Sequence, residues 1–134
     1  MYTERESTMV NLELDKYDFF VGVPDSALKN IIKQIEETKK KHIIACNEAH
    51  AVAIAFGAIL AGSNPCVYLQ NSGLGNIINP LTSLCIPSKI EPFLLIGHRH
   101  TLEQHKIMGE VDEQILNILG YKNYFLFKGE NNVK

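Results

Sequence analysis

A polar segment with two glycines, QNSGLGN, runs from Gln70 to Asn76 between apolar stretches. Gly73 and Gly75 first suggest a phosphate-binding loop. A Walker loop needs Gly-Lys followed by Ser or Thr, and a dinucleotide fingerprint needs a third glycine; the chain has neither. From spacing alone, the two glycines simply turn the chain and Asn71 caps a helix.

Glu48 is a carboxylate between two apolar segments, HIIAC before it and AVAIAFGAIL after it. Two roles are open. A glutamate in the first turn of a helix is stabilised by the helix dipole. A partly buried acid can instead exchange a proton with a bound ligand, which is a catalytic role.

Arg99 lies in the segment HRH, directly after the apolar run FLLIG. A guanidinium there suits bidentate capture of a carboxylate, phosphonate or sulfonate, and the alternative is a surface salt bridge. The neighbouring His98 and His100, together with His105, have no matched carboxylate spaced beside them. We therefore expect this chain alone to hold no metal.

The composition excludes several classes of partner. Thirteen Lys and Arg against fifteen Asp and Glu give a net charge of -2 in 134 residues, so no basic field is available for nucleic acid or anionic lipid. No apolar run approaches the roughly 18 residues of a membrane span. Cys46, Cys66 and Cys85 lie in apolar surroundings and are predicted to be reduced packing thiols, which favours a cytoplasmic protein.

The elements that position these residues alternate between strand and helix. Strands are predicted over residues 19–23, 42–46, 66–69, 93–97 and 124–127. Helices are predicted over residues 4–15, 49–61 and 111–119, and through Leu81, Leu84 and Cys85. A further helix is predicted to be capped by Asp25 or Ser26, to carry an apolar face within 28–35 and to end in the lysine run 39–41. This order predicts an α/β fold, a parallel sheet with helices on both faces. Residues 1–128 form a single predicted domain, and 129–134 a flexible tail.

In such a sheet, ligands bind at the carboxyl ends of the strands. The segments in that position are polar: Pro24-Asp25-Ser26, Asn47-Glu48, Gln70-Asn71-Ser72-Gly73 and His98-Arg99-His100. The sequence therefore predicts that four polar clusters meet at one edge of the sheet.

Together, GVPDS (22–26), NEAHAVAIAFGAILAG (47–62), QNSGLGNIINPLTSL (70–84) and GHRH (97–100) resemble a known enzyme family. They are similar to the pyrimidine-binding domain of thiamine-diphosphate-dependent phosphonopyruvate and sulfopyruvate decarboxylases. The resemblance covers about residues 15 to 120, and QNSGLGN is its most specific element. It implies a parallel α/β domain that contacts the aminopyrimidine of the cofactor.

The resemblance also implies roles for individual residues. The family's glutamate touches N1' of the aminopyrimidine, and the matching residue is Glu48, the expected catalytic group. Gln70, Asn71 and Gly73 are expected at the cofactor. The residues expected at the substrate are Asp25, Ser26 and Arg99, with the arginine holding the distal anion.

The family binds the diphosphate and its Mg²⁺ through a second domain with a Gly-Asp-Gly segment, which this sequence lacks. The resemblance thus implies the α-type half of a hetero-oligomer, with thiamine diphosphate and Mg²⁺ completed by a diphosphate-binding (β-type) subunit. GVPDS and NPLTSL favour phosphonopyruvate as the 2-oxo acid. The division of the enzyme between two separate chains and the segment EQHKIMGE (103–110) favour sulfopyruvate as the alternative.

A third interpretation is a non-catalytic module that pairs with a partner through the small-residue helix 49–61. The altered pair Ala49-His50, where the family usually has Gly-Ala after its glutamate, and the short length of the sequence motivate it. A further departure from the family pattern is that His98 and His100 replace the tryptophan and glycine that often flank the arginine.

Overall fold

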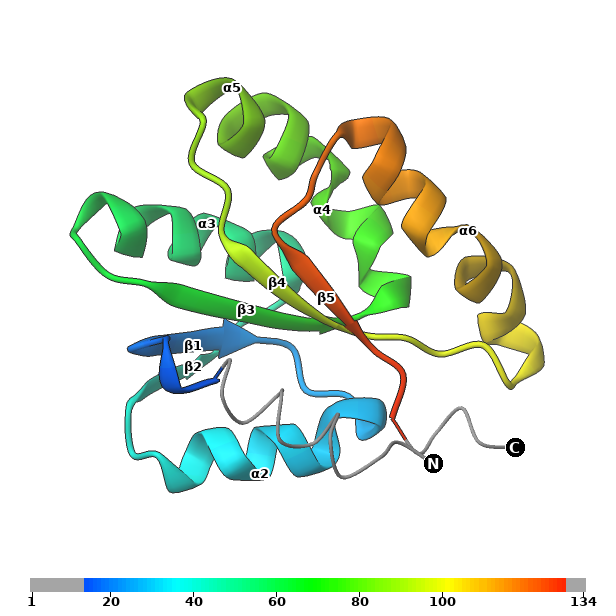
Figure 1. The fold of residues 1–134 in the computed structure, drawn as a ribbon, viewed down its shortest axis with the longest axis horizontal. Helices are drawn as coiled ribbons and strands as arrows, with labels where there is room; N and C mark the ends of the chain where they lie inside the picture. The colour runs from blue at the N-terminus through cyan, green and yellow to red at the C-terminus, as the bar shows by residue number, and fades with distance from the viewer. Residues whose placement is uncertain (1–13, 130–134) are drawn as a thin grey trace.

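The structure, a computed structural model, describes residues 14–129. Five parallel strands form one sheet in the order β2-β1-β3-β4-β5 (Figure 1). The strands are β1 (Phe19–Gly22), β2 (Lys41–Ile44), β3 (Pro65–Gln70), β4 (Phe93–Gly97) and β5 (Tyr124–Phe127). The predicted α/β parallel sheet is confirmed, and every predicted strand overlaps an observed one.

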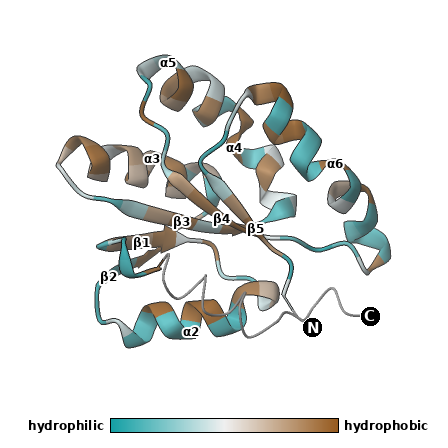
Figure 2. Cartoon of the chain, viewed as in Figure 1, coloured by the Kyte–Doolittle hydropathy of each residue, from teal (hydrophilic) through white to brown (hydrophobic). Residues whose placement is uncertain are grey.

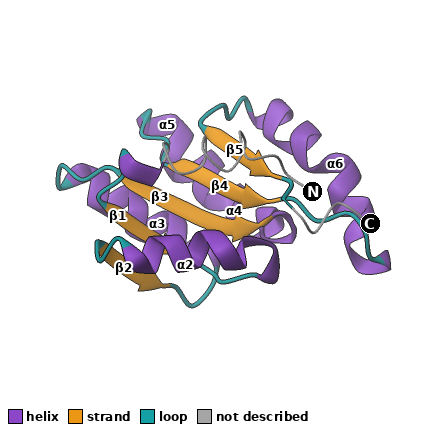
Figure 3. Ribbon diagram, turned by 60° about the horizontal axis from the view of Figure 1, so that its bottom comes forward, coloured by secondary structure: helices purple, strands orange, loops and turns teal. Residues whose placement is uncertain are grey.

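Helices cover both faces of this sheet (Figures 1 and 3). The short η1 (Ser26–Leu28) and α2 (Lys29–Glu37) lie on one face. The other face carries α3 (Glu48–Leu60), α4 (Leu74–Pro80) and α6 (Glu103–Leu119). Figure 2 shows that α2 is brown towards the sheet and teal away from it, because Ile31 and Ile35 are buried while its lysines are exposed.

Alternating strand residues fill two cores, one on each face. Val67, Leu69, Leu94 and Ile96 point to the α3, α4 and α6 side, whereas Cys66, Tyr68 and Leu95 point to the α2 side. The inner strands β1, β3 and β4 are buried along their whole length, apart from Gln70. This is the pattern expected of a parallel sheet with both faces covered.

The register brings the strand ends level. Gly22 pairs with Ile44 on one side and Tyr68 on the other, and Gln70 pairs with Gly97. The loops that follow β2, β1, β3 and β4 therefore leave neighbouring strands at the same edge. The predicted meeting of four polar segments at that edge is confirmed.

Gly22 in β1 allows Tyr68 of β3 to reach across to β2. The Tyr68 hydroxyl lies 2.7 Å from His42 Nε2. Burial raises the pKa of Tyr68 and lowers that of His42, so the neutral forms of both groups share this hydrogen bond. A Cβ at Gly22 would lie 2.2 Å from the Tyr68 carbonyl oxygen and 2.6 Å from its ring.

We expect Gly22→Ala to lower the free energy of unfolding by about 3 kcal/mol, because the overlap involves backbone that cannot rotate away. Urea denaturation measures this change. Gly57→Ala is the control, since a Cβ at this position on α3 meets nothing within 4 Å. It should stabilise the helix by up to about 1 kcal/mol. Equal stability of the two variants would contradict the packing described for Gly22.

Two helices differ from their predicted bounds. α2 ends at Glu37, short of the predicted lysine run, because Lys39 is left-handed with a φ of 57° and Lys41 already begins β2. α6 begins at Glu103, eight residues before the predicted start at 111. Gly109 weakened the helical pattern in the sequence, because glycine has a low helix propensity. In the structure a Cβ at this position would lie 2.5 Å from the His100 ring and 2.8 Å from the Arg99 carbonyl oxygen. The glycine thus lets α6 pack closely against the HRH segment.

The helix predicted through Leu81, Leu84 and Cys85 is present, but its winding changes after Pro80. After α4, the five residues of η3 (Leu81–Cys85) form a π-helical turn, followed by α5 (Ile86–Ser88). Pro80 ends α4, where its missing N–H and its ring disturb the ladder of i to i−4 bonds.

The thiol prediction needs a correction. Cys66 and Cys85 are buried, and burial raises the pKa of the Cys85 thiol to about 11, so it stays protonated near neutral pH. Cys46, in contrast, is exposed. Calling it a packing thiol was wrong, because it follows the edge strand β2, in a loop that the core does not cover.

Some predictions lie at the ends of the chain. Of the helix predicted over 4–15, only Leu14 and Asp15 fall among the described residues, and both are helical. Of the predicted tail, only Gly129 is described. Within residues 14–129, no helix is both long and apolar enough to cross a membrane.

Candidate functional site

Asp25 is the centre of one polar cluster at the carboxyl edge of the sheet. Its side chain caps η1 by accepting from the Ala27 N–H at 2.8 Å. The same carboxylate accepts from Gln70 Nε2 at 2.5 Å and from Arg99 Nη1 at 3.3 Å. Residues from the ends of β1, β3 and β4 are thereby joined.

Arg99 also donates to Ser26 Oγ at 3.2 Å. Its side chain is 19% exposed, so solvent and ligands still reach it. Arg99 therefore forms an ion pair, as the salt-bridge interpretation expected, but with Asp25, a residue predicted to contact the substrate. Ser72 extends the same cluster by donating to Gln70 Oε1.

A cleft of about 680 Å³ opens beside this cluster. Asp25 and Ser26 line one end of it, and Lys29 and Lys33 of α2 line its wall. The two lysines are four residues apart and so lie on the same helical face. Asp25 and Glu36 belong to the same lining, so the cleft carries two lysines and two carboxylates, and Arg99 is paired with one of these carboxylates.

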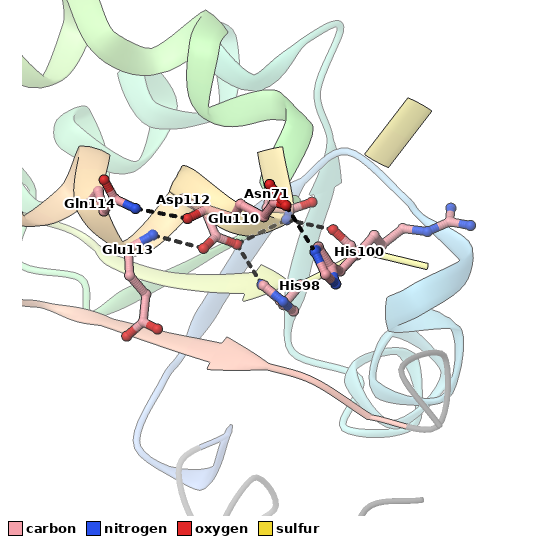
Figure 4. Close-up of polar contacts among 8 residues, drawn as sticks. Asn71, His98, His100, Glu110, Asp112, Glu113 and Gln114 are labelled. Carbon is pink, nitrogen blue, oxygen red and sulfur yellow. Dashed lines mark hydrogen bonds and ion pairs between the residues drawn. The ribbon is translucent and has the colours of Figure 1, made fainter. Parts of the chain in front are cut away.

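A second cluster centres on Asp112 of α6, which is only 2% exposed (Figure 4). Asp112 Oδ2 lies 2.5 Å from His98 Nδ1 and accepts from Asn71 Nδ2 at 2.9 Å. Its Oδ1 accepts from the Glu113 N–H at 2.7 Å. These three contacts compensate for the burial of the carboxylate and tie α6 to the ends of β3 and β4.

Asn71 is fully buried, and its orientation is fixed by two acceptors. Its Nδ2 donates to Asp112 Oδ2 and to the Arg99 carbonyl oxygen at 3.0 Å, so the amide nitrogen must face them. Its Oδ1 is buried and has no hydrogen-bond partner among residues 14–129. An unmatched buried acceptor calls for a donor from water or a ligand.

Glu48 lies at the first position of α3, next to Asn47, whose side chain caps the helix by accepting from the His50 N–H at 2.9 Å. Its carboxylate is half-buried and packs over Gly73, where a Cβ would lie 2.5 Å from Glu48 Cγ and 2.7 Å from Oε2. Oε1 accepts from Asn76 Nδ2 at 2.7 Å.

The predicted site residues thus fall into separate groups. Asp25, Ser26, Gln70 and Arg99 form one cluster, and Asn71 joins the Asp112 cluster on the other face. Glu48 and Gly73 meet at the start of α3 and α4. Among residues 14–129, no set of three or more His, Cys, Asp or Glu side chains is arranged to hold a metal ion.

Sequence reasoning missed two residues, Asp112 and Asn76. Asp112 lies 13 residues beyond Arg99, within the helix predicted over 111–119, and only its burial distinguishes it from the exposed acids of α6. Asn76 was part of the quoted motif QNSGLGN. Its position three residues after Gly73 was a usable signal, since residues i and i+3 are neighbours on a helix.

The chain matches none of the protein-family models against which it was compared. Individual proteins do match. A sulfopyruvate decarboxylase subunit alpha from Methanocaldococcus jannaschii is 39% identical over 112 residues, which cover 80% of this chain and 66% of that protein. The chain is a homologue of the sulfopyruvate and phosphonopyruvate decarboxylases.

Two further homologues support this relationship. A phosphonopyruvate decarboxylase from Streptomyces viridochromogenes is 36% identical over 103 residues, covering 72% of this chain and 26% of that enzyme. A sulfopyruvate decarboxylase subunit alpha from Methanothermobacter thermautotrophicus is 33% identical over 107 residues, covering 76% of this chain and 65% of that subunit. The chain therefore spans about two thirds of these sulfopyruvate decarboxylase alpha subunits and about a quarter of this phosphonopyruvate decarboxylase.

Proposed function

We propose that this chain is the α-type subunit of a thiamine-diphosphate-dependent decarboxylase, acting on a 2-oxo acid that carries a tetrahedral anionic group. The observation that carries the proposal is the position of Glu48. Its carboxylate lies half-buried at the carboxyl edge of the sheet, over Gly73 of the QNSGLGN motif. The homologous decarboxylases support the same reaction class.

The residues at this edge fit an aminopyrimidine. Such a ring offers nitrogen acceptors and an exocyclic amino donor, and it needs an acid at one ring nitrogen. Glu48 supplies the acid. Asn71 Oδ1, buried and unmatched, is an acceptor that still needs a donor. Gln70 and Asp25 add polar groups at the ends of the neighbouring strands.

Thiamine diphosphate, when bound, supplies an electron sink for the carbon that loses carbon dioxide. In our proposal, Glu48 exchanges a proton with the ring nitrogen that it faces. Arg99 binds the distal anion of the substrate. Asp25 and Ser26 hold the Arg99 guanidinium in place.

A separate subunit would bind the diphosphate and its Mg²⁺. The alpha-subunit names of two of these homologues support a partner of some kind. The active site would then lie between the two subunits of a hetero-oligomer.

Sulfopyruvate is our first choice of substrate, because the alpha subunits that share most of their length with this chain are sulfopyruvate decarboxylases. Phosphonopyruvate is the second candidate, favoured by the segments GVPDS and NPLTSL. Sulfonate and phosphonate are both tetrahedral anions, so Arg99 suits either one.

The test is a decarboxylation assay of the chain co-purified with its partner subunit, with thiamine diphosphate and Mg²⁺ present. We expect carbon dioxide and sulfoacetaldehyde from sulfopyruvate, at a higher kcat/KM than for phosphonopyruvate. A higher value for phosphonopyruvate would reverse the choice of substrate. Release of carbon dioxide from neither acid would contradict the proposed function.

A further inference from the structure

The Glu48 carboxylate is held by one directed contact. Among residues 14–129, Asn76 is the only side chain that hydrogen-bonds it, through Nδ2 to Oε1 at 2.7 Å. The amide orientation follows from the chemistry, because an ionised carboxylate only accepts and must therefore meet the NH₂ group.

The backbone of Asn76 is itself well fixed, although its side chain is exposed. Its neighbours on α4, Leu74 and Ile77, are buried in the core shared with α3. Val52 of α3 belongs to the same core. Because helix packing sets the distance between Asn76 and Glu48, the contact does not depend on a flexible loop.

This contact makes the two oxygens of Glu48 unequal. Oε1 accepts from Asn76, so a proton taken up by Glu48 goes to Oε2, the oxygen that lies nearest a Cβ built on Gly73. We propose that Asn76 is a positioning residue for Glu48, which fixes the carboxylate and assigns its exchangeable proton to Oε2. The catalytic meaning of this assignment rests on the proposed function.

Asn76→Asp tests the assignment without changing shape. It replaces a donor by a carboxylate facing Glu48, and two carboxylates at this distance share one proton. Asn79→Asp is the matched control. It adds the same charge on the same helix. The Asn79 side chain accepts from Ser83 Oγ at 2.8 Å, and an aspartate can make the same contact.

The first readout does not need turnover. In the complex with its partner, built with carbon-13-labelled glutamate in this chain, Glu48→Gln identifies the Glu48 carboxyl signal. We expect this signal to change with pH over a more alkaline range in Asn76→Asp than in the wild type or in Asn79→Asp. Identical titration in the two aspartate variants would overturn the positioning role, whether or not the complex is an enzyme.

The second readout is the pH dependence of kcat. At alkaline pH, where both carboxyl groups of the Asn76→Asp variant are ionised, kcat should fall by about tenfold or more and recover partly as the pH is lowered. Asn79→Asp should keep the wild-type profile. Matching profiles for the two variants in an active complex would overturn the inference. An inactive wild-type complex would instead contradict the proposed function.

Discussion

Glu48→Gln should lower the kcat of the reconstituted decarboxylase by between about a hundredfold and ten-thousandfold. Glutamine keeps the size of the side chain and can still accept from Asn76 through its carbonyl oxygen. It cannot exchange a proton with a ring nitrogen, so the loss falls on chemistry rather than on folding. Carbon dioxide release at saturating substrate measures kcat.

Glu103→Gln is the control for this variant. Glu103 is also the first residue of a helix, and it is exposed on α6. Both substitutions remove a negative charge from a helix N-terminus, so both lose the same dipole interaction, worth about 0.3–1 kcal/mol. If Glu48 acts only through the helix dipole, the two variants will have equal activity, and its catalytic role is then wrong.

Gly73→Ala should lower kcat by about tenfold or more while the fold is retained. The new Cβ would overlap Glu48 at Cγ, Cδ and Oε2, all within 2.5 to 2.7 Å. The glutamate side chain can rotate, so it would move off Gly73 and lose the Asn76 contact. We expect a smaller cost to stability, about 1–3 kcal/mol from overpacking.

Gly75→Ala provides a close comparison, two residues further along the same motif. A Cβ at Gly75 meets nothing within 4 Å, and the residue lies within α4. Alanine there should leave kcat unchanged and stabilise the helix by up to about 1 kcal/mol. Equal kcat for the two alanine variants would show that Gly73 does not make room for Glu48.

The strand order along the chain and the carboxyl-edge clusters were predictable from local pattern. Short apolar runs ending in polar residues mark buried strands, and parallel strands must send their following loops to one edge. This is why Asp25, Gln70 and Arg99 could be grouped before any contact was known. Their mutual hydrogen bonds add detail to a grouping that topology already required.

The Asp112 cluster was not predictable in the same way. Asp112 lies 41 residues from Asn71 and 14 from His98 in sequence, and its role depends on how α6 packs over the ends of β3 and β4. The early start of α6 has the same origin. Gly109 disfavours a helix locally, whereas close packing against His100 requires it.

Calorimetric titration of thiamine diphosphate with Mg²⁺ tests the central claim most directly: Glu48 and its neighbours form half of a cofactor site that a partner subunit completes. We predict binding heat for the complex of the two subunits and none for this chain alone. Absence of binding to the complex, under conditions where the two subunits co-purify, would contradict the account.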